Sequence, residues 1–306
     1  MPTSRSNANI PALLTDPLRL RRQGRKAAGV LQSLTPHGPL YSAHLRGHHG
    51  RKRAGSGDNF WQFRSYMPGD SASMIDWRRS ARSDGHFVRQ YEWEAARDVW
   101  LICDLGPHMM FSGDDASMTK AEHAAILTVA LAHLLARGGE RVGLMGQSQR
   151  PIAGKYGTDL IAEKLVQAVR AEPLDILTAA PPARGTHTIW ISDFLTPVQR
   201  LRARLKALVR SGTQLHLVQL IDPYERDFPF SGRISFEGPS RTNGHLIESA
   251  QDIRSRYLGR LAKHQDHVET LAREAGATLL RHTTDASLSP CLVALNARLE
   301  NPMVAL

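Results

Sequence analysis

The sequence predicts an α/β fold: a doubly wound, mostly parallel sheet preceded by a polar N-terminal extension of irregular or β structure. From about residue 95 onward, short apolar runs alternate with longer segments of helical periodicity, which is typical of a parallel sheet with crossover helices. Two of the apolar runs end directly on an aspartate, at Asp104 and Asp193. Because open α/β sheets bind ligands at the carboxyl ends of their strands, we expect both carboxylates at a binding edge.

The order of the elements follows from the period of the apolar residues. The expected strands cover residues 99–103, 141–145, 188–192, 214–221 and 278–281, with one more at 87–91 before the core begins. The expected helices cover residues 120–135, 159–169, 197–210 and 248–275, and an edge hairpin is expected around 233–236. Thr158 or Asp159 is the expected N-cap of the second helix.

Composition indicates an ordinary folded chain. The 306 residues are 42% hydrophobic, and no run approaches the roughly 20 apolar residues that a transmembrane helix needs. The polar residues 1–9 are not followed by the apolar segment of a secretion signal. Cys103 and Cys291 are far apart, so neither a disulfide framework nor a thiolate zinc site is indicated. We therefore expect a cytoplasmic protein.

The positive charge is concentrated at the N-terminus. Residues 1–55 hold ten basic residues and one acidic residue, so they carry +9 of the formal charge of +10. These residues are Arg5, Arg19, Arg21, Arg22, Arg25, Lys26, Arg46, Arg51, Lys52 and Arg53, against Asp16. We expect residues 1–46 to form a loosely structured arm. Such an arm could contact acidic lipid, nucleic acid or an acidic protein, or could only aid solubility.

One stretch identifies a family. It reads RSYMPGD at 64–70, IDW at 75–77 and SAR at 80–82. This combination resembles the DUF58 family, whose motif region would here cover residues 47–94. The resemblance implies that residues 95–306 form a von Willebrand A-like domain of the Rossmann type. It also implies a non-enzymatic adaptor or assembly factor whose partner is a MoxR-type AAA+ ATPase, in the cytoplasm or at the periphery of the inner membrane.

The same motif supplies the expected partner-binding residues. They are Arg64, Tyr66, Asp70, Asp76, Trp77 and Arg82. Pro68 and Gly69 are typical of a turn, and the two aspartates can each accept the forked donors of Arg64, Arg78 or Arg82. Trp77 is expected to anchor the loop. These charges could tie the loop to the domain, form a docking surface, or do both.

The resemblance also implies a divalent-cation site. A von Willebrand A domain holds its ion through D-x-S-x-S after the first strand, a later threonine and a later aspartate. Here residues 104–108 read DLGPH, so both serine positions are replaced. The candidate ligands are Asp104, His108, Thr158 and Asp193. We expect at most weak magnesium binding or none, with a transition metal at His108 as the other possibility.

The alternative functions are a nucleic-acid-binding protein that uses the basic arm, and an enzyme. A metal-dependent hydrolase or nuclease could use Asp104, His108 and Asp193, with the basic arm holding nucleic acid. The sequence contains no GxxxxGK[ST] phosphate-binding loop and no G-x-S-x-G elbow. Two carboxylates and a histidine without a recognisable general base do not favour catalysis. We therefore expect an interaction module with no catalytic residues and no tightly bound cofactor, and we do not expect nucleic acid as the partner.

Overall fold

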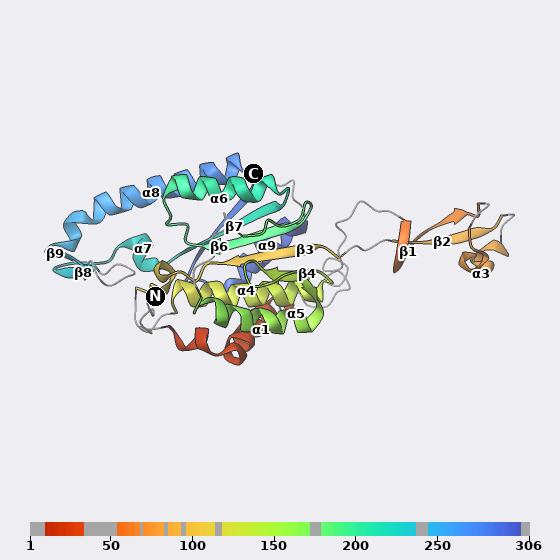
Figure 1. Ribbon diagram of the computed structural model, residues 1–306, viewed down its shortest axis with the longest axis horizontal. Helices are drawn as coiled ribbons and strands as arrows, with labels where there is room; N and C mark the ends of the chain where they lie inside the picture. Colours follow the sequence, from red (N-terminus) through yellow and green to blue (C-terminus); the bar gives the residue numbers. More distant parts are fainter. Residues whose placement is uncertain are drawn as a thin grey trace.

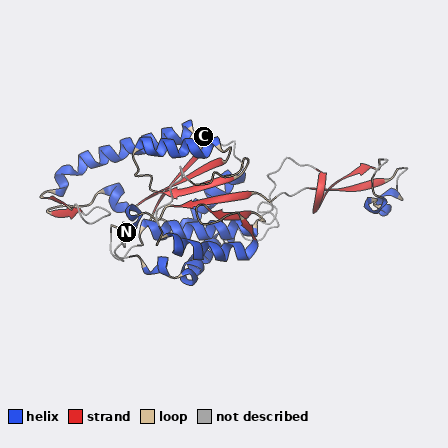
Figure 2. Ribbon diagram, in the orientation of Figure 1, coloured by secondary structure: helices blue, strands red, loops and turns tan. Residues whose placement is uncertain are grey.

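A mixed six-stranded sheet with helices on both faces forms the centre of the molecule (Figures 1 and 2). The computed structural model describes residues 10–33, 54–67, 70–82, 85–92, 96–113, 118–171, 179–236 and 244–300. The strands are β1 (Ala54–Ser65), β2 (Phe87–Glu92), β3 (Asp98–Cys103), β4 (Arg141–Leu144), β5 (Ile152–Ala153), β6 (His187–Ser192), β7 (Gln214–Ile221), β8 (Ile234–Phe236), β9 (His245–Ile247) and β10 (Thr278–Thr283). The α-helices are α1 (Pro17–Ser33), α3 (Trp77–Ser80), α4 (Lys120–Arg137), α5 (Gly154–Ala168), α6 (Val198–Arg210), α7 (Pro223–Asp227), α8 (Ala250–Glu274) and α9 (Leu288–Glu300).

The central sheet has the order β10-β7-β6-β3-β4-β5. Its neighbouring strands are parallel except for β4 and β5, which are antiparallel. The predicted α/β class is therefore confirmed, and the sheet is mixed because of this one edge strand. β6 is buried at every position, which explains the apolar run over residues 189–191 at its centre, since both faces of a parallel sheet are covered by helices.

Two hydrophobic cores lie on the two faces of the sheet. One contains α1, α4, α5 and α9, and the other contains α6 and α8 (Figure 1). Successive residues of β6 alternate between them: Ile189 and Ile191 belong to the first core and Trp190 to the second. No helix in the described ranges is long and apolar enough to cross a lipid bilayer.

Helix α4 is central to the first core. It begins with a capping box, in which the Thr119 hydroxyl accepts from the Glu122 amide and the Glu122 carboxylate accepts from the Thr119 amide. Most of its side chains are buried, so its sequence is apolar nearly all round rather than amphipathic. This capping fixes the first turn, where Lys120 lies at the carboxyl edge of the sheet.

The N-terminal segment differs from the predicted loose arm. A short 3-10 helix over Ala12–Thr15 and helix α1 pack onto α4, and Leu14 and Leu20 are fully buried. Burial of each such leucine stabilises the fold by about 1.5 to 3 kcal/mol. Arg21 and Arg25 pair with Asp159 of α5 at 3.1 and 2.7 Å, so part of the basic charge is used inside the fold. The remainder of the predicted arm, residues 1–9 and 34–46, lies outside the described residues.

Helix α5 begins five residues before its predicted start. Its N-cap is Ala153, without a side-chain hydrogen bond, and Gly154 has φ of 73°. The predicted capping by Thr158 or Asp159 is therefore wrong, because the chain turns at a glycine that can adopt this left-handed conformation. The other predicted helices and strands agree with the structure to within a few residues. Besides α1, the strands and α-helices that were not predicted are β1, β5, α3, α7 and α9.

Candidate functional site

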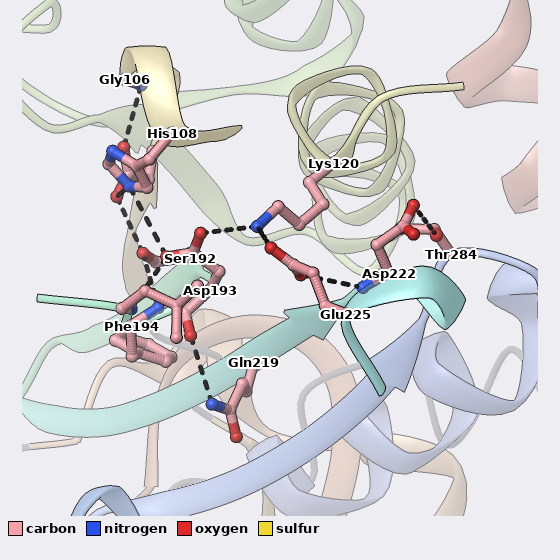
Figure 3. Close-up of polar contacts among 12 residues, drawn as sticks. Gly106, His108, Lys120, Ser192, Asp193, Phe194, Gln219, Asp222, Glu225 and Thr284 are labelled. Atoms are coloured by element: carbon pink, nitrogen blue, oxygen red, sulfur yellow. Dashed lines mark hydrogen bonds and ion pairs between the residues drawn. The ribbon is translucent and has the colours of Figure 1, made fainter. Parts of the chain in front are cut away.

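Two aspartates and a histidine meet at the carboxyl edge of the sheet. Because β3 and β6 are parallel neighbours, with Cys103 paired to Ile191, the residues that follow them lie side by side. The Nε2 atom of His108 is 3.1 Å from Oδ2 of Asp104 and 3.6 Å from Oδ1 of Asp193. Three of the four predicted metal-site residues are therefore brought together (Figure 3).

Asp104 accepts hydrogen bonds at both carboxylate oxygens. Its Oδ1 accepts from the Gly106 amide at 3.0 Å, and its Oδ2 accepts from Ser192 Oγ at 2.8 Å and contacts His108. Burial alone would raise the pKa of Asp104, but these donors hold it below its usual value. The hydrogen bond to Asp104 likewise raises the pKa of His108. The pair is therefore an ionised carboxylate next to an imidazole that favours its protonated form.

Gly106 is required by this arrangement. A Cβ atom at residue 106 would lie 2.7 Å from Cε1 of His108 and 3.1 Å from Oδ1 of Asp104. The serine of a D-x-S-x-S motif therefore cannot be accommodated while His108 keeps its contact with Asp104. The changes at positions 106 and 108 depend on each other.

Asp193 is paired with a buried lysine. The Lys120 ammonium lies 2.8 Å from Oδ2 of Asp193 and 2.6 Å from Oε1 of Glu225 (Figure 3). Its side chain and that of Asp193 are each 1% exposed. Burial would lower the pKa of Lys120, yet the two carboxylates raise it above its usual value, so the lysine is charged. A buried charge of this kind is stable only because its partners are this close.

Glu225 reaches the lysine from helix α7. Asp222 and Glu225 form a capping box at the start of α7: Oδ1 of Asp222 accepts from the Tyr224 amide at 2.9 Å, and Oε2 of Glu225 accepts from the Asp222 amide at 3.3 Å. Burial raises the pKa of Glu225, and the contact with Lys120 opposes this shift. Local capping thus places Glu225 where the long side chain of Lys120 can reach it.

The turn after β6 is held in an uncommon backbone conformation. Phe194 is a non-glycine residue with φ of 55°, and its side chain is buried. Its amide donates to Ser192 Oγ at 3.1 Å, and its carbonyl oxygen is 2.8 Å from Nε2 of His264 on α8. Such strain persists only where the surroundings enforce it. Here the turn aims Ser192 and Asp193 toward the site.

Thr158 does not join the cluster. Strand β5 runs antiparallel to β4, and its last residue, Ala153, pairs with Arg141 at the start of β4. Helix α5 therefore begins at the amino edge of the sheet, opposite Asp104. The Thr158 hydroxyl, near the start of this helix, donates to the carbonyl of Lys155 at 2.7 Å. The expected threonine ligand therefore lies at the wrong edge for a shared metal site.

The donor set does not fit the divalent cation that the resemblance implies. Each oxygen of Asp104 and Asp193 accepts from a donor of the protein: Gly106, His108, Ser192, Leu195 or Lys120. A metal would have to displace one of these donors. Within the described ranges, no group of three or more His, Cys, Asp or Glu side chains is arranged to hold a metal ion.

The predicted partner-binding residues lie on the β1–β2 hairpin. Arg64 binds Asp70 in a bidentate ion pair with both N···O distances at 2.5 Å, as the sequence suggested. The guanidinium lowers the pKa of Asp70 to about 2, and the Met67 amide also donates to this carboxylate at 2.9 Å. Tyr66 donates to the carbonyl of Asp70 at 3.3 Å. The turn residues Pro68 and Gly69 lie outside the described residues.

Asp76 caps a helix, and Trp77 is exposed rather than packed as an anchor of its loop. Asp76 caps α3 by accepting from the Arg79 amide at 2.9 Å, and its own amide donates to Phe87 of β2 at 2.8 Å. The side chain of Trp77 is 61% exposed, and its ring meets the His86 ring edge-on with 5.9 Å between centroids. Arg82 is exposed at the end of the same short helix. Asp76 is thus structural, and Trp77 is presented to solvent.

The hairpin and the carboxyl edge do not form one face. The hairpin precedes β3 in the sequence, so the chain enters β3 at Asp98, the amino end of this strand. Asp104 follows the carboxyl end of the same strand. Figure 1 shows the hairpin beyond the amino ends of the central strands, and α7 at the opposite end. The hairpin loop and the carboxyl edge are therefore two separate surfaces.

Sequence reasoning missed the residues that complete the edge cluster: Lys120, Ser192, Asp222 and Glu225. In the sequence, Ser192 is the last residue of a predicted strand and Lys120 is the first residue of a predicted helix. Nothing in the neighbouring sequence indicates that either side chain is buried. A signal was available in Asp222-Pro223-Tyr224-Glu225, since Asp followed three residues later by Glu is a capping-box pattern. A lysine in the first turn of a helix, where the helix dipole disfavours a cation, was a weaker signal.

Comparisons with known proteins match a family model, related sequences and a solved structure. A family described as "Protein of unknown function DUF58" matches residues 62–267. Uncharacterized protein Mb1516 of Mycobacterium bovis and uncharacterized protein Rv1480 of Mycobacterium tuberculosis are each 27% identical over 258 residues, covering 79% of this chain and 79% of the relative. Among solved structures, conserved hypothetical protein BatB from Bacteroides thetaiotaomicron matches with a TM-score of 0.40 and 16% identity, over 68% of this chain and 98% of that chain.

Proposed function

The chain belongs to the DUF58 family, which matches more than half of its length, and we propose that it is a non-enzymatic protein-interaction module. Its partner is the MoxR-type AAA+ ATPase that the motif resemblance implies, and its role is that of an adaptor or assembly factor in the cytoplasm. Residues 1–55 supply a basic segment that suits contact with the inner-membrane surface or with an acidic protein.

The exposed apolar side chains of the hairpin carry this proposal. We call Tyr66, Met67, Met74 and Trp77 the tip surface; Met67 and Trp77 are each 61% exposed. All four lie within one short stretch of sequence at the end of the hairpin. Large apolar side chains gathered in this way mark interaction sites, and tryptophan contributes strongly to binding at the centre of an interface.

The tip surface rests on a rigid base. The bidentate ion pair between Arg64 and Asp70 closes the loop on one side. On the other side, the Ser80 hydroxyl donates to the Asp76 carbonyl at 2.8 Å and accepts from the Phe87 amide at 2.9 Å. These bonds fix α3 on the strand next to it before any partner binds, which reduces the entropy that ordering would cost on binding.

We also propose that the central sheet is of the von Willebrand A type. The support is the position of the two aspartates: Asp104 follows the first strand of the sheet, and Asp193 follows the neighbouring strand β6, at the same carboxyl edge. That kind of domain carries its acidic ligands at this edge. The metal-site residues in this chain are modified, as described above.

The proposal favours binding over catalysis because of how the edge cluster is bonded. His108 already contacts Asp104 at 3.1 Å, and Asp104 accepts from Ser192 as well. Ser192 Oγ therefore donates to the carboxylate and not to the histidine, so this hydroxyl is not paired with a base as an activated nucleophile would be. The hydrolase alternative predicts turnover that is lost in Asp104→Asn. We expect instead that the wild-type protein shows no turnover of phosphodiester or ester substrates.

Affinity purification from native lysate tests the tip surface. With the tagged protein as bait, Trp77→Ala should reduce recovery of the AAA+ ATPase by about tenfold or more, since loss of a central tryptophan costs about 2 kcal/mol or more. Tyr156→Ala is the matched control, because Tyr156 is also an exposed aromatic residue, 74% exposed, but lies on α5. Equal recovery with Trp77→Ala and wild type, at equal thermal stability, would contradict the proposal.

A further inference from the structure

A lysine ammonium lies where the sheet edge would otherwise need a cation. Lys120 is buried beneath the carboxyl edge and bridges Asp193, which follows β6, and Glu225, which belongs to α7. Lysine is almost never fully buried unless it is paired. The first turn of α4 does not favour its charge, because the helix dipole is positive there. Its position is therefore determined by the two carboxylates.

The oxygens around this ammonium are fully engaged. Oδ1 of Asp193 accepts from the Leu195 amide at 2.9 Å, and Oδ2 accepts from Lys120. Oε2 of Glu225 accepts from the Asp222 amide, and Oε1 accepts from Lys120. The cluster thus satisfies its buried carboxylates with protein donors alone, as buried polar groups require.

We propose that the Lys120 ammonium replaces a divalent cation at this edge, so that the native protein takes no metal ion between Asp104, Asp193 and Glu225. The lysine supplies a positive charge that is covalently part of α4 and cannot dissociate. It joins three elements, α4, the end of β6 and α7, whose relative placement an ion would otherwise set. The shape of the edge is then independent of the concentration of free metal.

The neighbouring residues fit the same replacement. His108 occupies the side of Asp104 and Asp193 that faces solvent, at 3.1 and 3.6 Å. Gly106 makes room for the His108 ring, since a Cβ atom would lie 2.7 Å from it. The ring of Phe111 lies 5.7 Å from the Lys120 ammonium and adds an apolar, weakly favourable surface for the charge. Each of the changes removes an oxygen ligand or adds a cation.

Binding measurements on the wild-type protein test the inference first. Titration with Mn²⁺, followed by electron paramagnetic resonance, should show no stoichiometric site, and the midpoint of thermal unfolding should be the same in Mg²⁺, Mn²⁺ and EDTA. One tightly bound equivalent of Mn²⁺ that is abolished by Asp193→Asn would overturn the inference.

Two substitutions of Lys120 distinguish the effect of its charge from the effect of its volume. Lys120→Met removes the charge but keeps the volume, whereas Lys120→Ala also opens room for an ion. Both should lower the unfolding midpoint by about 10 °C, because each leaves buried carboxylates without their cation. Saturating Mn²⁺ should restore about 5 °C in Lys120→Ala and almost nothing in Lys120→Met.

An exposed lysine provides the control. Lys206→Ala on α6 should have the same midpoint of thermal unfolding as wild type, and added Mn²⁺ should not change it. The inference is contradicted if Lys120→Met unfolds within about 2 °C of wild type. It is also contradicted if Mn²⁺ fails to stabilise Lys120→Ala, or stabilises both Lys120 variants equally.

Discussion

Residue 106 shows how one side chain depends on another at the edge of the sheet. The sequence predicted the loss of a serine ligand at this position but gave no reason for glycine. The structure gives one, because the His108 ring occupies the place of a Cβ atom. The histidine in turn is held by Asp104 and lies near Asp193. The two substitutions relative to the expected motif therefore form a single local change.

The protonation of His108 tests this dependence. Its contact with Asp104 raises its pKa in the folded protein. Gly106→Ala should displace the ring and lower this pKa toward the ordinary value of about 6.5. Asp104→Asn should lower it in the same direction. The measurement is an NMR titration of the His108 ring protons in each variant.

The stability effect of His108 has a defined sign. Because the folded pKa is raised, its contribution is fully present below the unfolded pKa of about 6.5 and is lost as pH rises through the folded value. An unchanged His108 pKa in both Gly106→Ala and Asp104→Asn would show that the ring is held by other contacts.

Helix α1 shows at the level of an element why the sequence prediction failed. Its buried face is narrow and consists of Leu20, Gly24 and Ala28, spaced four residues apart. The numerous arginines around this face suggested a solvated arm. Gly24 permits close packing, because a Cβ there would lie 2.4 Å from Cγ1 of Val129 on α4. A helix that packs through small residues gives little apolar signal in the sequence.

Two glycines of α1 provide a matched test of this packing. Gly24→Ala should destabilise the protein by about 1 to 3 kcal/mol, because α1 must move away from α4. Gly29→Ala has nothing within 4 Å of its new Cβ and should stabilise by up to about 1 kcal/mol through helix propensity. Chemical unfolding of both variants gives the comparison. Similar small effects in both would mean that α1 is not docked as described.

The other elements show which patterns the sequence reveals. The strand at residues 188–192 was predicted because three successive apolar residues, 189–191, indicate a strand covered on both faces, and this pattern is visible locally. The early start of α5 was missed because it depends on the positive φ of Gly154. The burial of Lys120 could not be predicted, since it depends on two carboxylates distant in sequence, Asp193 and Glu225. Contacts of this kind are set by the topology and not by local composition.

At the scale of the whole molecule, three buried histidines lie in strands of the central sheet and a fourth, His123, lies on α4. His187 and His216 stack with centroids 5.4 Å apart, and His123 lies 6.3 Å from His282. Burial lowers the pKa of His187 to about 3 and those of His123 and His216 to about 4, and it also lowers that of His282. All four are therefore neutral in the folded protein at neutral pH.

This burial predicts sensitivity to mild acid. The unfolded chain binds these protons at about pH 6.5, so stability is fully present above that pH and is lost as pH falls toward the folded values. Each histidine can contribute a slope of up to about 1.4 kcal/mol per pH unit. The free energy of unfolding measured with urea should decrease as the pH is lowered from about 7.5 to about 5. A flat profile over that range would contradict the buried, neutral assignment.

The two candidate surfaces, the tip surface and the edge cluster, lie apart in the molecule. The tip surface lies beyond the amino ends of the central strands, and the edge cluster lies at their carboxyl ends (Figure 1). The edge cluster is closed by its own ion pairs, whereas the tip surface exposes Met67 and Trp77. We therefore propose that the edge cluster stabilises the fold and that the tip surface binds the partner.

Comparison of one substitution at each surface tests this assignment most directly. The dissociation constant of the AAA+ ATPase should be measured with wild type, Trp77→Ala and His108→Ala, each shown to be folded. We predict that Trp77→Ala weakens binding by about tenfold or more and that His108→Ala leaves it within about twofold of wild type. Strong loss of binding in His108→Ala, with Trp77→Ala unaffected, would contradict the account.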